Sequence, residues 1–233
     1  MKTGFAGFPP EAMTFFRGLR RHNDREWFLP RKQVFLEKVR APMEALVTAL
    51  NADLIRYAPE YVTDPDKAIY RFYRDTRFSD DKTPYKDHIA AIFTRRGMTK
   101  HRAAGYYFAV SDREVEVAGG LYLPQTEELR AIRQHMAQHH EEFRRIVAAR
   151  KLRSLMGELE GDRLARAPKG FGPEHPAADL LKYKQFLFYR ILDPSLAATP
   201  RLFDEVATRF RVLAPFIEFL NRPLLPPRND PWK

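Results

Sequence analysis

The chain has 233 residues, with 40 lysines and arginines against 30 acidic residues, a formal net charge of +10 and no cysteine. A hydrophobic content of 44% and an aromatic content of 13% suffice for a buried core and exclude a wholly disordered chain. The absence of cysteine excludes disulfides, zinc sites with thiolate ligands, iron–sulfur clusters and cysteine nucleophiles.

Helices are predicted at the start of the chain. A short helix follows Pro10, because the next apolar residues share one helical face. A long amphipathic stretch is then predicted over residues 24–57, with Asn23 or Asp24 as its N-cap. We expect Pro42 to kink or divide this stretch, because proline cannot donate a helical hydrogen bond.

Short runs rich in aromatic and β-branched residues follow and predict strands. These runs cover residues 68–74, 88–95, 105–111, 114–123 and 182–192. The Ser111-Asp112-Arg113 triplet predicts a hairpin turn between two of the strands. The Gly119-Gly120 pair predicts a bulge or a close approach of two backbones.

The remaining helices are predicted over residues 125–150 and 200–220. Helices therefore come first, strands cluster in the middle and helices follow. This order predicts an α+β class, with a central, largely antiparallel sheet packed against N-terminal and C-terminal helices. We expect one globular domain over residues 8–222 and a proline-rich, irregular tail over residues 223–233.

The N-terminal sequence does not fit a signal peptide, because a single lysine is followed by proline and glutamate without a continuous apolar segment. No window approaches the ~18 apolar residues of a membrane-spanning helix. We therefore expect a cytoplasmic protein with no membrane partner.

The positive charge is concentrated in two segments. Residues 67–102 carry 10 basic and 4 acidic side chains, and residues 144–170 carry 8 basic and 3 acidic ones. Solvated basic faces are common, so the charge alone does not define a site. The first segment nevertheless coincides with the most distinctive motif of the chain.

That motif, residues 71–86, combines arginine, lysine, aspartate and tyrosine at close spacing, and two interpretations remain open. In the first, an internal network forms in which Asp75 pairs with arginine and holds the end of a strand. In the second, the basic side chains converge on phosphate or carboxylate, with Asp75 and Tyr85 as orienting or proton-handling groups and as weak candidates for catalysis. The candidate ligand-binding residues there are Arg71, Arg74, Arg77, Lys82 and Lys86. The Thr83-Pro84 pair predicts the start of a helical turn whose free N–H groups would face the anion.

The motif resembles the signature R-x-x-R-D-x-R-F-x-x-D-K-x-x-Y of an uncharacterised family, domain of unknown function 2461. Here the signature runs from Arg71 to Tyr85 and includes Phe78. The segment 23–28 is similar to an N-R-E-W-F element of the family, with one inserted aspartate. Other similar pieces are Gly105-Tyr106-Tyr107, Gly119-Gly120, Arg166 to Phe171, and His175-Pro176. The resemblance covers residues 8–222 and implies one domain, but it implies no activity, cofactor or ligand.

A further candidate ligand-binding residue is Lys169, which lies in a glycine-containing loop with His175 nearby in sequence, although a simple turn explains the same pattern. No glycine-rich nucleotide motif is present, so we expect no cofactor. The histidines at positions 135, 139 and 140 fit a solvated helix better than a metal site, and we expect no metal.

The sequence therefore predicts a protein that binds a small ligand bearing phosphate or carboxylate, and it predicts no particular reaction. Two alternatives remain. One is a non-catalytic module that binds nucleic acid through both basic segments. The other is a structural or partner-binding protein in which the motif is only an internal arginine–aspartate network.

Overall fold

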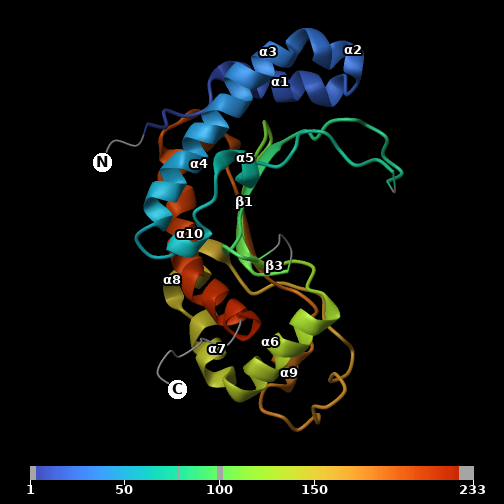
Figure 1. The fold of residues 1–233 in the computed structure, drawn as a ribbon, viewed down its shortest axis with the longest axis vertical. Coiled ribbons are helices and arrows are strands. Elements are labelled where there is room, and N and C mark those ends of the chain that lie inside the picture. Colours follow the sequence, from blue (N-terminus) through green and yellow to red (C-terminus); the bar gives the residue numbers. More distant parts are fainter. Residues whose placement is uncertain (1–3, 78, 99–101, 226–233) are drawn as a thin grey trace. The chain divides into compact units, whose positions relative to one another are not determined.

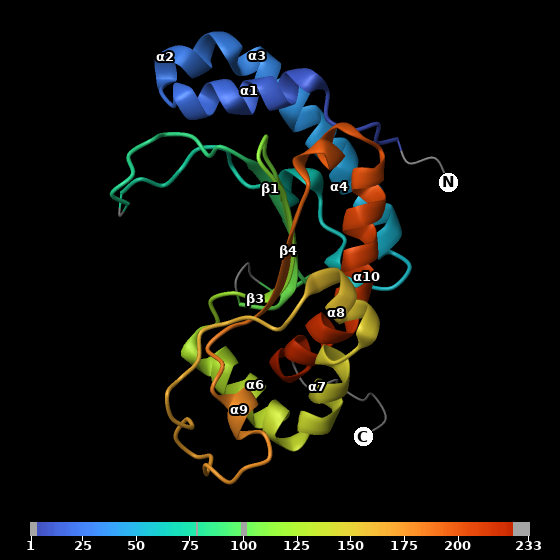
Figure 2. The same ribbon diagram turned by 180° about the vertical axis from the view of Figure 1, so that it is seen from behind.

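The computed structural model describes residues 4–77, 79–98 and 102–225, which form an α+β fold (Figures 1 and 2). The α-helices are α1 (Pro10–Arg21), α2 (Arg25–Phe28), α3 (Lys32–Val34), α4 (Ala41–Leu54), α5 (Pro65–Ala68), α6 (Thr126–Gln138), α7 (His140–Val147), α8 (Arg150–Met156), α9 (Ala178–Leu181) and α10 (Arg201–Asn221). Single 3-10 turns are η1 (Leu29–Arg31), η3 (Pro59–Tyr61), η4 (Pro194–Ala198) and η5 (Arg222–Leu224), and η2 (Phe35–Arg40) is π-helical.

The strands β1 (Ile89–Phe93), β2 (Gly105–Val110), β3 (Val115–Leu121) and β4 (Phe186–Leu192) form one antiparallel sheet in the order β1-β2-β3-β4. Burial alternates along β3, so every second side chain points into the core. The predicted α+β class with an antiparallel sheet is confirmed.

The contacts divide the chain into two compact units, each made of separated segments. The first unit comprises residues 1–93, 107–117 and 190–208, and the second comprises residues 94–106, 118–189 and 209–233. The strands β2, β3 and β4 and the helix α10 contribute residues to both units. The expected limits of a single domain at residues 8 and 222 stay a prediction, and residues 226–233 of the expected tail lie outside the described residues.

The core of each unit is rich in aromatic rings. In the first unit, Phe93 on β1 stacks on Phe108 on β2 with ring centroids 6.4 Å apart. In the second unit, Phe188 on β4 packs edge-on against Phe216 on α10 at 5.0 Å. Offset and edge-on pairs of this kind add to the stability that burial of the rings provides.

The amphipathic stretch predicted over residues 24–57 is largely helical, and its predicted interruption at Pro42 is confirmed. Asp24 caps α2, because its carboxylate accepts a hydrogen bond from the Trp27 N–H at 2.7 Å. The π-helical turn η2 ends directly before α4, and Pro42 is the second residue of α4. Because Pro42 has no N–H to donate, the regular hydrogen-bond ladder is interrupted there, which accounts for the irregular turn.

The predicted helix over residues 125–150 is likewise divided, into α6, α7 and the start of α8. The predicted helix over residues 200–220 is confirmed as α10. Strands are confirmed within 88–95, 105–111, 114–123 and 182–192.

The predicted close approach at Gly119-Gly120 is confirmed. Gly120 has a φ of +129°, and a Cβ atom placed on it would lie 2.0 Å from the carbonyl oxygen of Phe186 on β4. Only glycine fits at this point, because any side chain would collide with the neighbouring strand.

The predicted strand over residues 68–74 is wrong. This segment makes two isolated bridges with different partners, Ile69 with Ala91 on β1 and Tyr73 with Tyr85. The chain bends at Phe72, between the two bridges, so neither pairing extends into a ladder.

Among the described residues, no helix combines the length and the apolar composition that crossing a bilayer requires.

Candidate functional site

Residues 71–86, which we call the signature hairpin, form two extended arms that run out from β1 near α1 and α2 (Figures 1 and 2). The Arg74 N–H donates to the Pro84 carbonyl at 2.9 Å, and the Lys86 N–H donates to the Phe72 carbonyl at 3.0 Å. These bonds flank the bridge between Tyr73 and Tyr85 and join the two arms. The predicted helical turn at Thr83-Pro84 is wrong, because this segment is one arm of the hairpin.

An aromatic cluster anchors the base of the hairpin. Phe72 and Tyr85, one from each arm, are 7% and 1% exposed. The Phe72 ring lies 4.3 Å from Phe35, and the Tyr85 ring lies 4.3 Å from Phe28, measured between ring centroids. Phe15 on α1 contacts Phe28, Phe35 and Phe72. Burial of these large rings fixes the base of the hairpin against the N-terminal helices.

Asn23 holds the returning arm through both backbone groups of one residue. Its Nδ2 donates to the Tyr85 carbonyl at 2.9 Å, and its Oδ1 accepts from the Tyr85 N–H at 3.0 Å. An amide side chain matches a peptide group in this way because it carries one donor side and one acceptor side. This contact joins residues that are 62 positions apart in the sequence.

Asp75 lies between two arginines on the outer part of the hairpin. Arg77 donates to it in a bidentate geometry, with Nε at 2.9 Å and Nη2 at 2.8 Å from the two carboxylate oxygens. The Arg71 Nη2 lies 3.7 Å from the same carboxylate. The hydrogen bond from Arg77 lowers the pKa of Asp75 to about 2, so this carboxylate is ionised throughout the neutral range.

A second carboxylate orients Arg74. The Arg74 guanidinium pairs with Asp81 and donates to the Thr83 hydroxyl at 3.0 Å. Hydrogen bonds from the Thr83 backbone and hydroxyl, followed by the contact with Arg74, lower the pKa of Asp81. The Lys82 ammonium donates to the Thr76 carbonyl at 2.9 Å. The hairpin therefore carries its own carboxylate and carbonyl partners for its cations.

A small polar cavity of about 120 Å³, which we call the His88 pocket, lies in the first unit directly after the hairpin. Its lining residues are Asp87, His88, Ala109, Ser111, Arg113, Glu114 and Glu116. The His88 Nδ1 lies 3.2 Å from Asp87 Oδ1, and Arg113 donates to Asp87 Oδ2 at 2.7 Å. The contact with His88 lowers the pKa of Asp87 to about 2, whereas burial and the neighbouring Glu114 raise the pKa of Glu116. The pocket thus contains one carboxylate with a lowered pKa, Asp87, and one with a raised pKa, Glu116.

Over residues 11–219 the sequence matches the sequence model of a family described as "Conserved hypothetical protein (DUF2461)". The chain belongs to this family. The match confirms the family that the sequence resembles. No curated protein and no solved structure matches the chain.

Two of the segments that resemble the DUF2461 pattern meet in space. Asn23 begins one of them, Tyr85 ends the other, and the hydrogen bonds described above connect the two. Another such segment, which contains Lys169, lies in the loop between α8 and α9 (Figure 2). His175 stabilises that loop locally, because its Nδ1 accepts from the Ala177 N–H at 3.0 Å.

The predicted site residues of this DUF2461 chain are distributed as follows. Arg74, Arg77 and Lys82 lie on the outer part of the signature hairpin with Asp75, whereas Arg71 begins the first arm next to Phe72 at the base. Phe78 lies outside the described residues. Lys86 lies nearer the base, with its ammonium 4.9 Å from the centre of the Tyr70 ring. Tyr85 is inside the aromatic cluster, and Lys169 is an exposed residue of the second unit.

The residues of the His88 pocket were missed by the sequence reasoning. Asp87 and His88 directly follow the signature hairpin in the sequence, so an adjacent ionisable pair was the available signal. Arg113, Glu114 and Glu116 reach the pocket only because the turn between β2 and β3 brings them there. Among the described residues, no group of three or more histidine, aspartate or glutamate side chains has an arrangement that would hold a metal ion.

Proposed function

We propose that this DUF2461 chain is a cytoplasmic binding protein whose signature hairpin binds a ligand that carries phosphate or carboxylate. The observation that carries the proposal is the arrangement around Asp75. One carboxylate holds Arg71 and Arg77 close together, while their side chains remain 69% and 76% exposed. Two neighbouring guanidinium groups form a preorganised site for a phosphate or carboxylate group.

The remaining cations support the same proposal. Lys82 and Arg74 each use only some of their N–H donors on hairpin partners, which orient them without neutralising the segment. Residues 71–86 contain five cations against three aspartates, so the hairpin keeps a positive charge when its internal pairs are formed. Lys86 is the fifth cation, and Lys169 on the second unit stays a separate candidate.

The hairpin supports binding better than acid–base catalysis. A general base works best when its pKa lies near the working pH, and the pKa of Asp75 is far below that range. The buried ring of Tyr85 packs against Phe28 and Phe72, which gives it a structural role at the base of the hairpin.

The experiment is a thermal-shift titration with pyrophosphate, ATP and a sugar phosphate. For wild type we expect a stabilisation of about 3 kcal/mol at a ligand concentration near 100 Kd, which corresponds to a rise in Tm of about 6–12 °C. Arg71→Ala and Lys82→Ala should shift less, whereas Lys32→Ala, an exposed lysine on α3, should respond like wild type. The proposal would be refuted if the ligands do not raise the Tm of wild type, or if they raise the Tm of both hairpin variants as much as that of wild type.

The exposure of the hairpin also favours a second candidate, a nucleic acid, whose phosphates need no enclosed pocket. Binding of a labelled oligonucleotide should then weaken steeply between about 50 and about 200 mM salt. Retention of a small phosphate without oligonucleotide binding would exclude this second candidate.

A purely structural role for the network makes a different prediction. Under the binding proposal, replacing a hairpin residue should cost little stability, because exposed ion pairs contribute only about 0–1 kcal/mol each. Under the structural alternative, the same replacement should lower the Tm clearly. If Arg71→Ala alone lowers the Tm by more than about 5 °C, the structural alternative is favoured over the binding proposal.

A further inference from the structure

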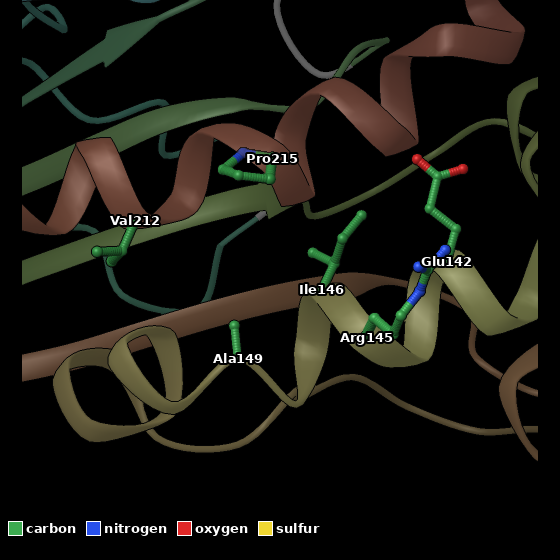
Figure 3. Close-up of a pocket in the computed structure, with 6 residues that line it drawn as sticks. All are labelled: Glu142, Arg145, Ile146, Ala149, Val212 and Pro215. Atoms are coloured by element: carbon green, nitrogen blue, oxygen red, sulfur yellow. The ribbon is translucent and has the colours of Figure 1, made fainter.

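The second unit contains a groove that is separate from the signature hairpin. It has a volume of about 310 Å³ and lies between α7, the residue that precedes α8, and α10 (Figure 3). Four apolar residues line it: Ile146, Ala149, Val212 and Pro215. Ile146 on α7 lies on one side, and Val212 and Pro215 on α10 lie on the other. We call this cavity the α7–α10 groove.

The charged residues at the groove give it a positive character. Glu142 and Arg145 complete the lining, but Glu142 is already neutralised. Arg222 donates to both of its carboxylate oxygens at 2.9 Å, and this contact lowers the pKa of Glu142. Arg145 therefore contributes a charge that the groove itself does not balance.

Arg150 and Lys151, the first two residues of α8, directly follow the lining residue Ala149 in the sequence. Both are exposed, as is Arg145. In the part of the chain that the structure describes, none of these three cations pairs with a carboxylate. Their neighbours differ, since Arg144 pairs with Asp179 and Arg153 pairs with Glu158. Of these three cations, Arg145 lines the groove, and Arg150 and Lys151 directly follow a lining residue in the second basic segment of the sequence.

We propose that the α7–α10 groove is a docking site for an acidic peptide segment of a partner protein, which inserts an apolar side chain between Ile146 and Val212. The apolar lining and the unbalanced cations together favour a ligand that carries both an apolar group and a negative charge. A nucleic acid would satisfy the cations and leave the apolar lining without a partner, whereas an apolar molecule without charge would leave the cations unused. An acidic peptide with an apolar anchor satisfies both.

The test uses the full chain and fluorescein-labelled acidic peptides with a central leucine, isoleucine, phenylalanine or methionine, followed by fluorescence anisotropy. We expect at least one to bind, with an affinity that falls as salt rises from about 50 to about 200 mM. Replacement of its central residue by serine, or of its acidic residues by lysine, should weaken binding about tenfold or more.

Variants of the protein locate the contact. Arg145→Glu and Val212→Asp should each reduce affinity about tenfold or more while leaving the Tm near that of wild type. Ala149→Glu places a negative charge, which repels an acidic peptide, at an exposed position of the groove. This variant replaces Val212→Asp in the test if Val212→Asp does not fold. Lys32→Glu on α3 changes the net charge equally in the first unit and should leave binding unchanged.

Several outcomes overturn the proposal. They are failure of every peptide to bind, equal binding of the serine peptides, undiminished binding by Arg145→Glu and Ala149→Glu, and displacement of the peptide by a DNA oligonucleotide at low concentration.

Discussion

The contact between Asn23 and Tyr85 leads to a quantitative prediction about the signature hairpin. Asn23→Ala removes two hydrogen bonds of 2.9 and 3.0 Å and leaves both backbone groups of Tyr85, a buried residue, without these partners. Because Asn23 is itself only partly buried, we expect a loss of about 2 kcal/mol, about 1 kcal/mol for each bond. For a chain of this size that loss lowers the Tm by about 4–8 °C.

The assay combines thermal unfolding with amide hydrogen exchange, because the local effect distinguishes this contact from general destabilisation. In Asn23→Ala, the Tyr85 and Lys86 amides should lose protection before the amides of β1 do. The matched control is Asn51→Ala. Asn51 makes the same double contact with Thr63, at 2.7 and 3.0 Å, in the same unit.

The control should lower the Tm by a similar amount and leave the Tyr85 amide protected. The reasoning is refuted if Asn23→Ala changes the Tm by less than about 1 °C. It is also refuted if both variants expose the Tyr85 amide equally, because the hairpin would then not depend on Asn23 in particular.

Three further predictions concern the core and its protonation. In urea unfolding, Gly120→Ala should lower the free energy of unfolding by about 3 kcal/mol or more, because its Cβ would lie 2.0 Å from the Phe186 carbonyl oxygen. The control Gly157→Ala should lower it by only about 1 kcal/mol, because Gly157 has a φ of +83° but open space around it. Burial lowers the pKa of His135 to about 4 in the folded chain, so the unfolded chain takes up its proton first as pH falls. Stability should therefore decline from about pH 6.5 towards pH 4, and His135→Gln should flatten this part of the Tm–pH curve. Phe72→Ala should lower the free energy of unfolding in urea by about 3–5 kcal/mol, because it leaves a cavity at the centre of the aromatic cluster.

Much of the fold follows from local patterns. The strands β1 to β4 and the helix α10 lie where alternation and helical spacing predict them, because burial of one face dominates those segments. The Gly119-Gly120 pair predicts the close approach of two backbones for a different reason, because glycine weakens a strand interior and is typical of such approaches.

The signature hairpin shows where such patterns fail. The aromatic run around Phe72 has strand composition, yet its neighbours bond to two different segments and the pairing never extends. The Thr83-Pro84 pair has helix-start composition, yet Asn23, distant in sequence, takes the backbone groups of Tyr85. Tertiary contacts override local propensity in both cases.

The candidate site was predictable in part. The pairing of Asp75 with arginine follows from short spacing and opposite charge. The burial of Tyr85 was not predictable, because the rings around it come from α1, α2 and η2. The same holds for the His88 pocket, whose charged residues come from segments that the sequence separates.

The segmented composition of the two units has a consequence for how the protein is made. The first unit lacks its last segment until residue 208 has been synthesised, and the last segment of the second unit, which contains most of α10, starts at residue 209. Neither unit can therefore complete its core before residue 208 has left the ribosome. The contact between Asn221 and Ala104, two hydrogen bonds of 2.8 Å across 117 positions, is among those that must wait. A cut near the middle of the chain would leave two incomplete cores, so the halves should not fold when expressed apart but should recover structure when expressed together.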